Sequence, residues 1–518
     1  MKFPKLFFLS IILISLVIQS LNAAEIIVTD SAGLANAIKN VQGGDTITLQ
    51  SGFYGSLTIY GKNNNSFVLI RANTGTTAVF KTINFNNSSY WELSGVHIKP
   101  RYTSGADGKK ALNLSGNYLT AKNCIINYSD DISGWTDSTW LARAGNGITM
   151  YGTNIIVKDN IISVVDHGIS NSARYTLVSG NVISNFRGDG IRGLGDDAVY
   201  EYNIIKNSFD VDDNHDDGFQ SWSVGPGGVG TGVVKNVVLR GNTIINFEDP
   251  NQPYRGNMQG IGLFDGMYEN WVVENNLIIV DHWHGISFYG AINCKIINNT
   301  VIDNNLSPSP DPWIRINNHK NGTPSSGVIV RNNIATDYAL TGGVTADHNV
   351  EITMSQAASY FVNPSGGTGD YHLISTSPAI DAGSSDLAPT IDKDGTFRPW
   401  GNGFDLGCYE YTGTTQVIEQ NIPESFQLFQ NYPNPFNPST KIRFSIPNVG
   451  SELAQTILKV YDVLGNEIAT LVDEYKSAGT YEVEFNSSTI KHPLSSGIYF
   501  YQLRTRSFIS TKSMILLK

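Results

Sequence analysis

Cysteine is scarce in this 518-residue chain, which has only Cys124, Cys294 and Cys408. The three lie far apart and their number is odd, a pattern that argues against a disulfide framework and against a zinc site of closely spaced thiolates. We therefore expect each of them to be a small buried hydrophobic side chain.

Charged residues are also few, at 16% of the chain, and the formal net charge is −11. A chain with that balance is a poor partner for nucleic acid or for an anionic membrane surface, so we expect neither. The composition is poor for helices, because 51 glycines and frequent asparagines favour many short strands joined by tight turns. We therefore predict an all-β protein.

Long hydrophobic runs are confined to the first 24 residues. Two lysines precede an apolar run from Leu6 to Ile18, and the small residues Ala23 and Ala24 follow it. This order is typical of a secretory signal peptide, which we predict over residues 1–24. No later segment is apolar enough to span a bilayer, so we expect no membrane span in the mature chain.

A short pattern repeats from about Val68 to Asp337. Its first element is a step from glycine to an apolar residue, found at Gly147-Ile148, Gly168-Ile169, Gly190-Ile191, Gly218-Phe219, Gly260-Ile261, Gly285-Ile286 and Gly327-Val328. The closest repeats are 21 and 22 residues apart. At about 3.3 Å per strand residue, that length makes one coil of three short strands and three turns. The repeat therefore predicts a β-solenoid.

The second element of the repeat is an asparagine, found at Asn160, Asn181, Asn203, Asn242, Asn276, Asn299 and Asn333. We expect a ladder in which these side-chain amides hydrogen-bond along the axis, with each asparagine in the left-handed conformation that it tolerates at a tight turn. The residues three positions earlier predict an inward-facing column: Val157, Val178, Tyr200, Leu239, Val273, Ile296 and Val330.

The two ends of the repeat region carry further signals. Residues 31–38 predict a short amphipathic helix with Ser31 as its N-cap, and a Gly-Asp-Thr-Ile strand follows. This order resembles the N-terminal cap of right-handed parallel β-helix proteins. Residues 371–411 contain Ser-Pro-Ala-Ile-Asp-Ala-Gly and Asp-Leu-Gly-Cys-Tyr-Glu-Tyr, and they resemble the closing segment of secreted β-helix proteins. The resemblance implies a right-handed parallel β-helix of about ten coils over residues 25–411, the fold of pectate, alginate and chondroitin lyases.

The chain changes character after residue 411. A polar linker at 412–428 leads to Asn-Tyr-Pro-Asn-Pro-Phe-Asn-Pro, and alternating strands at Lys441–Ile446 and Thr456–Tyr461 predict a small antiparallel β-sandwich. Residues 429–518 resemble the type A C-terminal sorting domain of the type IX secretion system. The resemblance implies that the type IX secretion machinery is a partner. It also implies passage through the periplasm and export across the outer membrane, to the cell surface or the medium.

Long spacings in the repeat mark insertions. Two of the intervals between repeated glycine steps, from Gly218 to Gly260 and from Gly285 to Gly327, are each 42 residues, about twice the shortest spacing. We expect loops at 130–145, 224–232, 248–256 and 306–325. Loops that leave one side of a rigid rod usually wall a groove, so we predict a groove beside them.

The acidic run Asp210–Trp222 contains five aspartates and one histidine. Carboxylates this close together repel one another, so they bind a cation, share protons or remain in water. Oxygen-rich sites suit calcium, and Asp212 and Asp213 are our candidate ligands for Ca²⁺. We expect no other cofactor.

Positions counted from the repeated glycine identify outward side chains. The residue before the glycine and those two and four after it form one exposed strip, with about 4.8 Å between coils. Candidate catalytic residues on the strip and in the acidic turn are Asp189, Arg192, His215, Asp216, Asp217 and His284. Candidate substrate-binding residues are His167, Gln220, Trp222, Tyr289 and Arg315. Aromatic residues suit the apolar faces of sugars, and arginine suits uronate carboxylates.

Three reactions on a polysaccharide fit these groups. In a lyase, His215 or His284 removes the C5 proton of a uronate, Ca²⁺ or an arginine neutralises the carboxylate, and Tyr289 protonates the leaving oxygen. A glycoside hydrolase uses two or three carboxylates, and the motif order here resembles that of polygalacturonases. A mannuronan C5-epimerase uses the lyase groups and returns the proton to the opposite face. We predict a monomeric uronate lyase, with hydrolase, epimerase and a non-catalytic glycan-binding or adhesive solenoid as alternatives.

Overall fold

The computed structural model describes residues 23–100, 110–304, 311–413, 426–447, 454–476, 479–490, 494–505 and 508–517. All but the last two residues of the predicted signal peptide lie outside this part of the chain. The contacts divide the chain into two compact units, residues 1–413 and residues 414–518. Within the described segments, no helix is long and apolar enough to cross a membrane.

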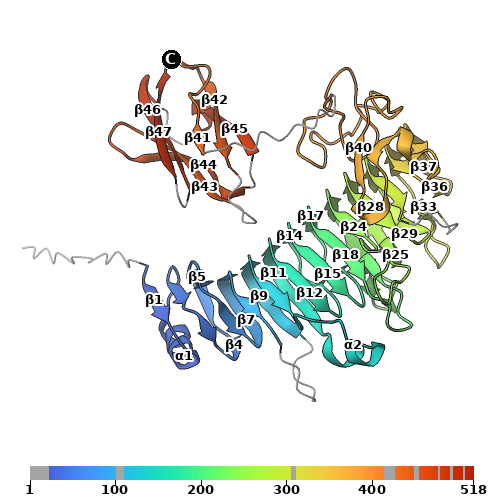
Figure 1. Cartoon of the computed structure of the whole chain (residues 1–518), viewed down its shortest axis with the longest axis horizontal. Helices are drawn as coiled ribbons and strands as arrows, with labels where there is room; N and C mark the ends of the chain where they lie inside the picture. The colour runs from blue at the N-terminus through green and yellow to red at the C-terminus, as the bar shows by residue number, and fades with distance from the viewer. Residues whose placement is uncertain are drawn as a thin grey trace, which may run out of the picture. The chain divides into compact units, whose positions relative to one another are not determined.

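The first unit is a right-handed parallel β-helix whose coils each contribute strands to three faces (Figure 1). The first face consists of β4 (Ser56–Tyr60), β7 (Thr82–Ser94), β9 (Lys110–Lys122), β11 (Asn146–Lys158), β13 (Ile169–Asn171), β16 (Ile191–Gly193), β19 (Asp217–Trp222), β25 (Gln259–Asp265), β29 (His284–Tyr289), β33 (Trp313–Asn317) and β36 (Asp337–Leu340). The second face consists of β1 (Glu25–Val28), β2 (Thr46–Leu49), β5 (Asn63–Ala72), the second halves of β7, β9 and β11, and then β14 (Thr176–Ser179), β17 (Ala198–Glu201), β23 (Val238–Arg240), β27 (Val272–Glu274), β31 (Lys295–Ile297), β34 (Val328–Arg331) and β37 (Val344–Asp347). The third face is a 12-stranded sheet of β3 (Gly52–Phe53), β6 (Ala78–Phe80), β8 (His97–Ile98), β10 (Ile125–Asn127), β12 (Ile161–Val165), β15 (Val182–Phe186), β18 (Ile204–Ser208), β24 (Thr243–Ile245), β28 (Leu277–Val280), β32 (Thr300–Asp303), β35 (Ile334–Ala335) and β38 (Val350–Glu351).

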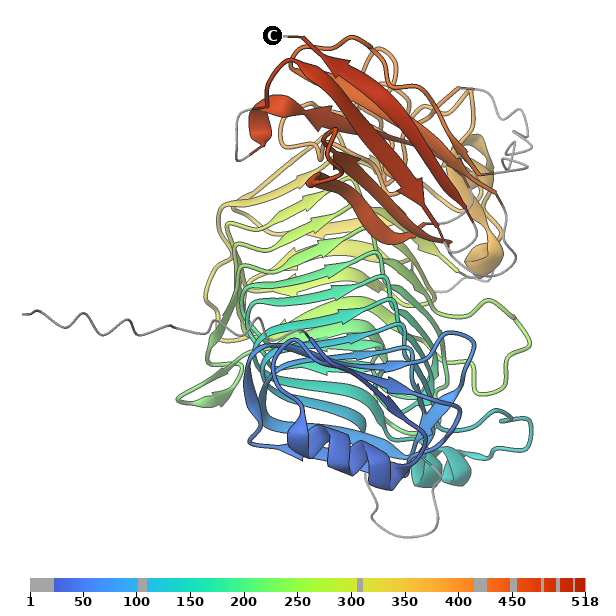
Figure 2. The ribbon, with the colours of Figure 1, turned by 90° about the vertical axis from the view of Figure 1, so that its left-hand side faces the viewer.

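Shorter elements decorate this unit. They are α1 (Ser31–Asn40), α2 (Asp137–Arg143), the hairpin β20 (Val224–Gly225) and β21 (Gly228–Val229), the small sheet β22 (Val233–Lys235), β26 (Met267–Glu269) and β30 (Ala291–Ile292), the pair β39 (Phe361–Asn363) and β40 (Asp370–Leu373), and two 3-10 turns at Ala357–Ser359 and Gly366–Thr368. Helix α1 lies across the N-terminal end of the stack (Figure 2), and its Leu34 and Ala37 are buried in the core of the solenoid. The predicted N-cap is wrong by one residue, because Asp30 caps the helix by accepting the Gly33 amide at 2.7 Å.

The repeated glycines turn the chain from the third face onto the first. A Cβ atom at Gly147, Gly168, Gly190, Gly218, Gly260 or Gly285 would lie 2.3–2.7 Å from a γ-methyl group of the facing third-face column. No side chain fits there, so the glycine step follows from packing.

The expectation that Gly327-Val328 belongs to this column is wrong. Val328 begins β34 on the second face, and Ile286 pairs with Ile314 of β33. The predicted loop 306–325 therefore contains a first-face strand that starts without a glycine.

The predicted asparagine ladder is confirmed. Each Nδ2 donates to the Oδ1 of the asparagine one coil further on, at 2.8–3.0 Å, from Asn160 through to Asn349. The predicted left-handed conformation belongs to the residue before each ladder asparagine, as at Asp159 (φ 56°) and Tyr202 (φ 53°). The predicted inward column is buried at all seven positions, and the three cysteines are buried and free.

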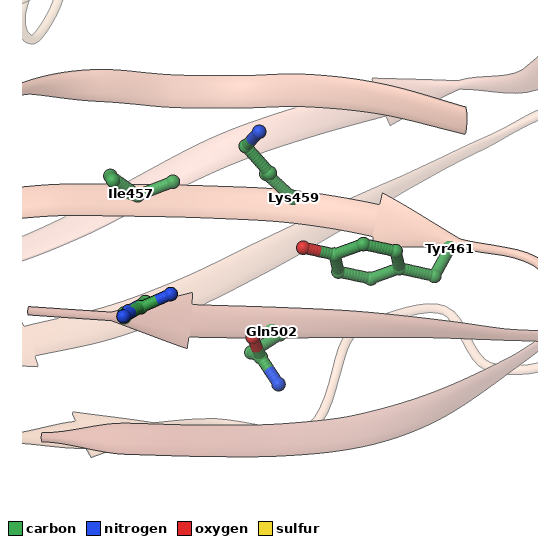
Figure 3. A pocket seen from close by; sticks show the side chains of 5 residues that line it. Ile457, Lys459, Tyr461 and Gln502 are labelled. Carbon is green, nitrogen blue, oxygen red and sulfur yellow. The ribbon is translucent and has the colours of Figure 1, made fainter. Parts of the chain in front are cut away.

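The second unit is an antiparallel β-sandwich, as predicted. One sheet has three strands, β41 (Gln427–Leu428), β42 (Ser439–Ile446) and β45 (Gly479–Asn486), and the other has four, β43 (Ala454–Tyr461), β44 (Glu467–Lys476), β46 (Gly497–Arg504) and β47 (Ile509–Leu516), with a 3-10 turn at Ser487–Thr489. Residues from both sheets, including Phe444 and Tyr501, form one buried core. A small hollow of about 130 Å³ lies on the four-stranded sheet (Figure 3), lined by Ile457, Lys459, Tyr461, Gln502 and Arg504.

Candidate functional site

The first face brings most of the predicted strip together on neighbouring strands. In β16 and β19, Arg192 pairs with Gln220. Between β19 and β25, Asp217 pairs with Gln259. Between β29 and β33, His284 pairs with Trp313. Asp217 and His284 therefore lie on the same face, two coils from each other. The spacing between neighbouring parallel strands is about 4.8 Å.

Asp217 is fully buried at the start of β19. Its Oδ2 lies 3.1 Å from Nδ1 of His215 and accepts a hydrogen bond from Nε2 of Gln220 at 2.9 Å. Gly262 on the next strand leaves room for Oδ1, since a Cβ there would lie only 2.2 Å from that oxygen. Burial, aided by the neighbouring Asp189, raises the pKa of the Asp217 carboxyl to about 7.

Asp189 occupies the same position one coil earlier and is also fully buried. Its carboxylate pairs with Nε of Arg192 and accepts the main-chain amide of Asp217 at 3.2 Å. Its own main-chain amide donates to Nδ1 of His167 at 2.8 Å, which makes that nitrogen an acceptor. Burial lowers the pKa of His167 to about 3, so its ring is neutral. The expectation that both aspartates are exposed is wrong, because His167, Arg192, His215 and Gln220 lie against them.

His215 is the most exposed member of this cluster, with 60% of its side chain exposed. Its Nδ1 is engaged by Asp217, and within the described segments Nε2 has no hydrogen-bond partner. The hydrogen bond to Asp217, together with the charges of Asp217 and Asp189, raises the pKa of His215. An accessible imidazole backed by a buried carboxylate is an arrangement that suits proton transfer.

Aromatic side chains dominate the face two coils further on. Nδ1 of His284 lies 2.8 Å from the Ser287 hydroxyl, and Nε1 of Trp313 donates to both groups at 3.2 Å. Burial lowers the pKa of His284 to about 3. Trp283 stacks on Trp313 with ring centroids 5.8 Å apart and is 46% exposed. Neither tryptophan is among the candidates that the sequence predicts. Trp313 stands in a strand that lacks the glycine marker.

Two arginines supply positive charge along the same face. The guanidinium of Arg192 lies 5.4 Å from the ring centre of Trp222. Arg315 lies 4.7 Å from the ring centre of Trp313 and 5.4 Å from that of Tyr289. Among the described residues, no carboxylate lies within ion-pair distance of Arg315, whereas Arg192 is paired with Asp189. Arg315 is therefore a cation on this face that is available to an anionic ligand.

The acidic turn does not fit a calcium cage. Asp212 accepts Nη1 of Arg187 at 2.9 Å and the Asn214 amide at 3.0 Å, and Asp213 is exposed. Asp216 points to the Ser208 hydroxyl of the third face, and burial raises its pKa to about 8. In the part of the chain that the structure covers, no three His, Cys, Asp or Glu side chains form a metal-ligand group. Calcium stays a prediction of the sequence alone.

Insertions support the acidic turn from one side. Trp140 of α2 packs against Phe209 with ring centroids 4.7 Å apart, in a small satellite core. The Asp137 amide of α2 donates to the hydroxyl of Tyr254 at 3.1 Å, which joins the insertion 130–145 to the insertion 248–256. These contacts hold the turn that presents His215. The predicted groove beside the loops stays a prediction.

Comparisons with known proteins bear on the two units separately. Residues 430–517 match the family model of the secretion system C-terminal sorting domain. No curated protein matches the chain. Solved structures similar to it include pectate lyase Pel9A (16% identity, 75% of this chain and 96% of that one, TM-score 0.46). They also include the PL6 family alginate lyase AlyGC (12% identity, 74% and 59%, TM-score 0.39). A third is the catalytic unit of a GH87 alpha-1,3-glucanase from Streptomyces thermodiastaticus (13% identity, 64% and 69%, TM-score 0.31). The second unit is thus a type IX sorting domain, which indicates export to the cell surface or beyond.

Proposed function

We propose that this protein is a polysaccharide lyase that cleaves a uronate-containing glycan by β-elimination, with His215 as the base. One observation carries the proposal: the exposed His215 imidazole is hydrogen-bonded to the fully buried carboxylate of Asp217. A carboxylate in that position orients the ring, fixes the proton on Nδ1 and leaves the lone pair of Nε2 directed away from it. Nε2 then takes the C5 proton of the uronate.

The carboxylate of the reacting uronate needs a cation next to this base. Arg192 lies beside Gln220 in the next coil, roughly 5 Å along the axis by the strand spacing. Asp189 holds the guanidinium through Nε, so Asp189 does not use the four N–H donors of the two terminal nitrogens of Arg192. As Nε2 of His215 removes the proton, a C4–C5 double bond forms and the C4–O bond breaks, and the leaving oxygen keeps the bonding electron pair and takes up a proton from solvent. Arg192 would stabilise the negative charge that develops on the carboxylate.

Arg315 is too far along the face to serve the same sugar. Three coils separate it from Gln220, through Gly262 and Ser287, which places it roughly 14 Å away by the strand spacing. We assign Arg315 and the rings of Trp313 and Tyr289 to another uronate of the same polymer. Arginine beside aromatic rings suits a sugar that has both an apolar face and a carboxylate.

A hydrolase fits this site less well. Its acid and its nucleophile or base must both touch the glycosidic bond or the attacking water. Asp189 and Asp217 have almost no exposed side-chain surface, at 1% and 0%. His284 is a weak candidate for the lyase base, since a pKa near 3 leaves it a poor proton acceptor at neutral pH.

The test is an ultraviolet assay for unsaturated uronate on alginate, polygalacturonate and chondroitin. We expect an absorbing product from at least one of them, and a fall in kcat of about 10²–10⁴-fold for His215→Asn. His348→Asn is the matched control, because His348 is also exposed and bonded to an aspartate (Asp347, 3.0 Å) but lies in the turn directly after β37 of the second face. Reducing ends without ultraviolet absorbance would identify a hydrolase instead. Binding without any product would favour the adhesive solenoid.

A further inference from the structure

A column of left-handed backbone residues marks the turn between the first and second faces. The positions, with φ between 53° and 61°, are Tyr90, Tyr118, Asn154, Tyr175, Asp197, Asn236, Asn270 and Asn293. Asparagine and aspartate tolerate this conformation through local hydrogen bonds, whereas tyrosine is strained in it. Most coils therefore use the residue type that the backbone favours, and the coils of Tyr90, Tyr118 and Tyr175 do not. Strain kept at a surface position points to a role beyond folding.

The strained tyrosines of the N-terminal coils form an aromatic stack. Tyr90 and Tyr118 are parallel, with ring centroids 4.5 Å apart and planes 8° apart, and Phe67 meets Tyr90 edge-on at 5.6 Å. The stack is not buried, since Phe67 is 41% exposed and Tyr118 is 40% exposed. The next residue of the column, Asn154, is shorter and bonds back to the Thr153 hydroxyl at 3.1 Å. It therefore leaves much of the Tyr118 ring uncovered.

An amide-rich hollow lies next to this stack. It has a volume of about 450 Å³ and is lined by Val41, Gln42, Gly43, Asn63, Asn64 and Asn65. Nδ2 of Asn64 reaches the main-chain carbonyl of Tyr90 at 3.4 Å, so the hollow and the stack are adjacent. None of the lining residues is ionised. Amides both donate and accept hydrogen bonds, as sugar hydroxyl groups do.

We propose that this surface, formed by Phe67, Tyr90, Tyr118 and the amide-lined hollow, binds an uncharged stretch of polysaccharide. Exposed aromatic faces pack against the C–H faces of pyranose rings, and the amides pair with their hydroxyl groups. The lining offers no cation for a carboxylate, so a neutral glycan is the fitting ligand. The stack is four coils from Asp217, roughly 19 Å along the axis by the strand spacing, so it forms a site separate from His215.

The test is affinity electrophoresis of the full chain through gels that contain hydroxyethylcellulose, galactomannan or xylan, with alginate as the anionic comparison. We expect at least one neutral polymer to retard the protein. The double variant Tyr90→Asn/Tyr118→Asn should weaken that binding at least tenfold. Asparagine is the residue that the fold itself uses at this column, so the fold should survive, which the melting temperature checks. Tyr175→Asn changes an unstacked tyrosine of the same column and should leave binding intact.

Two further arms keep the outcomes distinct. Phe67→Thr removes one exposed ring from outside the strained column and should weaken binding even if the double variant does not fold. His215→Asn should bind the neutral polymer as the unchanged protein does, whatever becomes of the proposed lyase activity. The proposal is overturned if no neutral polymer retards the protein, or if retardation persists in the folded double variant.

Discussion

Asp216→Asn tests whether the carboxyl beneath the site is protonated in the folded protein. Asp216 is 5% exposed, and burial raises its pKa from 3.8 to about 8. Between these values the unfolded chain has lost the proton while the folded protein keeps it. Stability contributed in this way is complete below pH 4 and falls as the pH rises towards 8. Asparagine resembles the protonated acid in shape but cannot ionise, so the variant should lose this dependence.

The size of the effect follows from the shift. Each pH unit between the two pKa values costs about 1.4 kcal/mol for one group, so raising the pH from 5 to 7 should cost the folded protein about 2.7 kcal/mol through Asp216 alone. Melting temperature changes by roughly 1–2 °C per kcal/mol in a chain of this size. The drop in melting temperature between pH 5 and pH 7 should therefore be about 3–5 °C smaller in Asp216→Asn than in the unchanged protein.

Scanning calorimetry at the two pH values measures this difference. Asp213→Asn is the matched control, because Asp213 lies in the same turn but is exposed, and its drop should equal that of the unchanged protein. Equal drops in Asp216→Asn and the unchanged protein would refute the reasoning. Activity provides a second readout, since Asp216 bonds to Ser208 of the third face and should be dispensable for catalysis.

Three further changes have defined outcomes. Asp217→Asn removes the carboxylate that raises the pKa of His215, so the acidic limb of the kcat/KM profile should move to lower pH; a limb that does not move contradicts the proposed pair. Arg315→Ala should raise KM several-fold on polyuronate with kcat nearly unchanged, and a pure loss of kcat would place Arg315 at the reacting sugar instead. Asn242→Ala breaks the buried ladder on both sides. Since each orphaned buried polar group costs about 1–3 kcal/mol, urea unfolding should show the solenoid destabilised by about 2–4 kcal/mol. A change below about 1 kcal/mol would show that water replaces the amide.

The fold was predictable because two single residues, a glycine and an asparagine, mark the coils of the repeat. Glycine is imposed wherever a Cβ would strike the third-face column, and asparagine is imposed wherever one buried amide must pair with the next. The failure at Gly327 has the same origin. The strand β33 begins with Trp313 and lacks the glycine, so the pattern predicts a loop there, while Gly327, a turn glycine before the second-face strand β34, satisfies the same pattern.

The placement of the candidate residues on one face was predictable, but their burial was not. Counting from the glycine placed Asp189, Asp217 and His284 correctly on one face, since strand alternation is regular. Burial depends on what lies against a side chain, and that is not periodic. Gly262 opens a space for the Asp217 carboxylate, and His215 comes from an irregular turn rather than a strand. Exposure and the resulting pKa values therefore required the three-dimensional arrangement.

The ladder gives the solenoid a direction. From Asn160 onwards every side-chain amide points its Nδ2 towards the C-terminal end of the stack, so the amide dipoles add along the axis, as peptide dipoles do in an α-helix. Hydrogen bonds in such a series polarise one another, which strengthens the middle of the row more than its ends. At the positive end, Asn349 donates to the carbonyl of Val330 at 2.7 Å. Coils at either end have only one neighbour, so we expect unravelling to begin there. A whole coil is the smallest piece that can be added or removed without breaking the asparagine ladder.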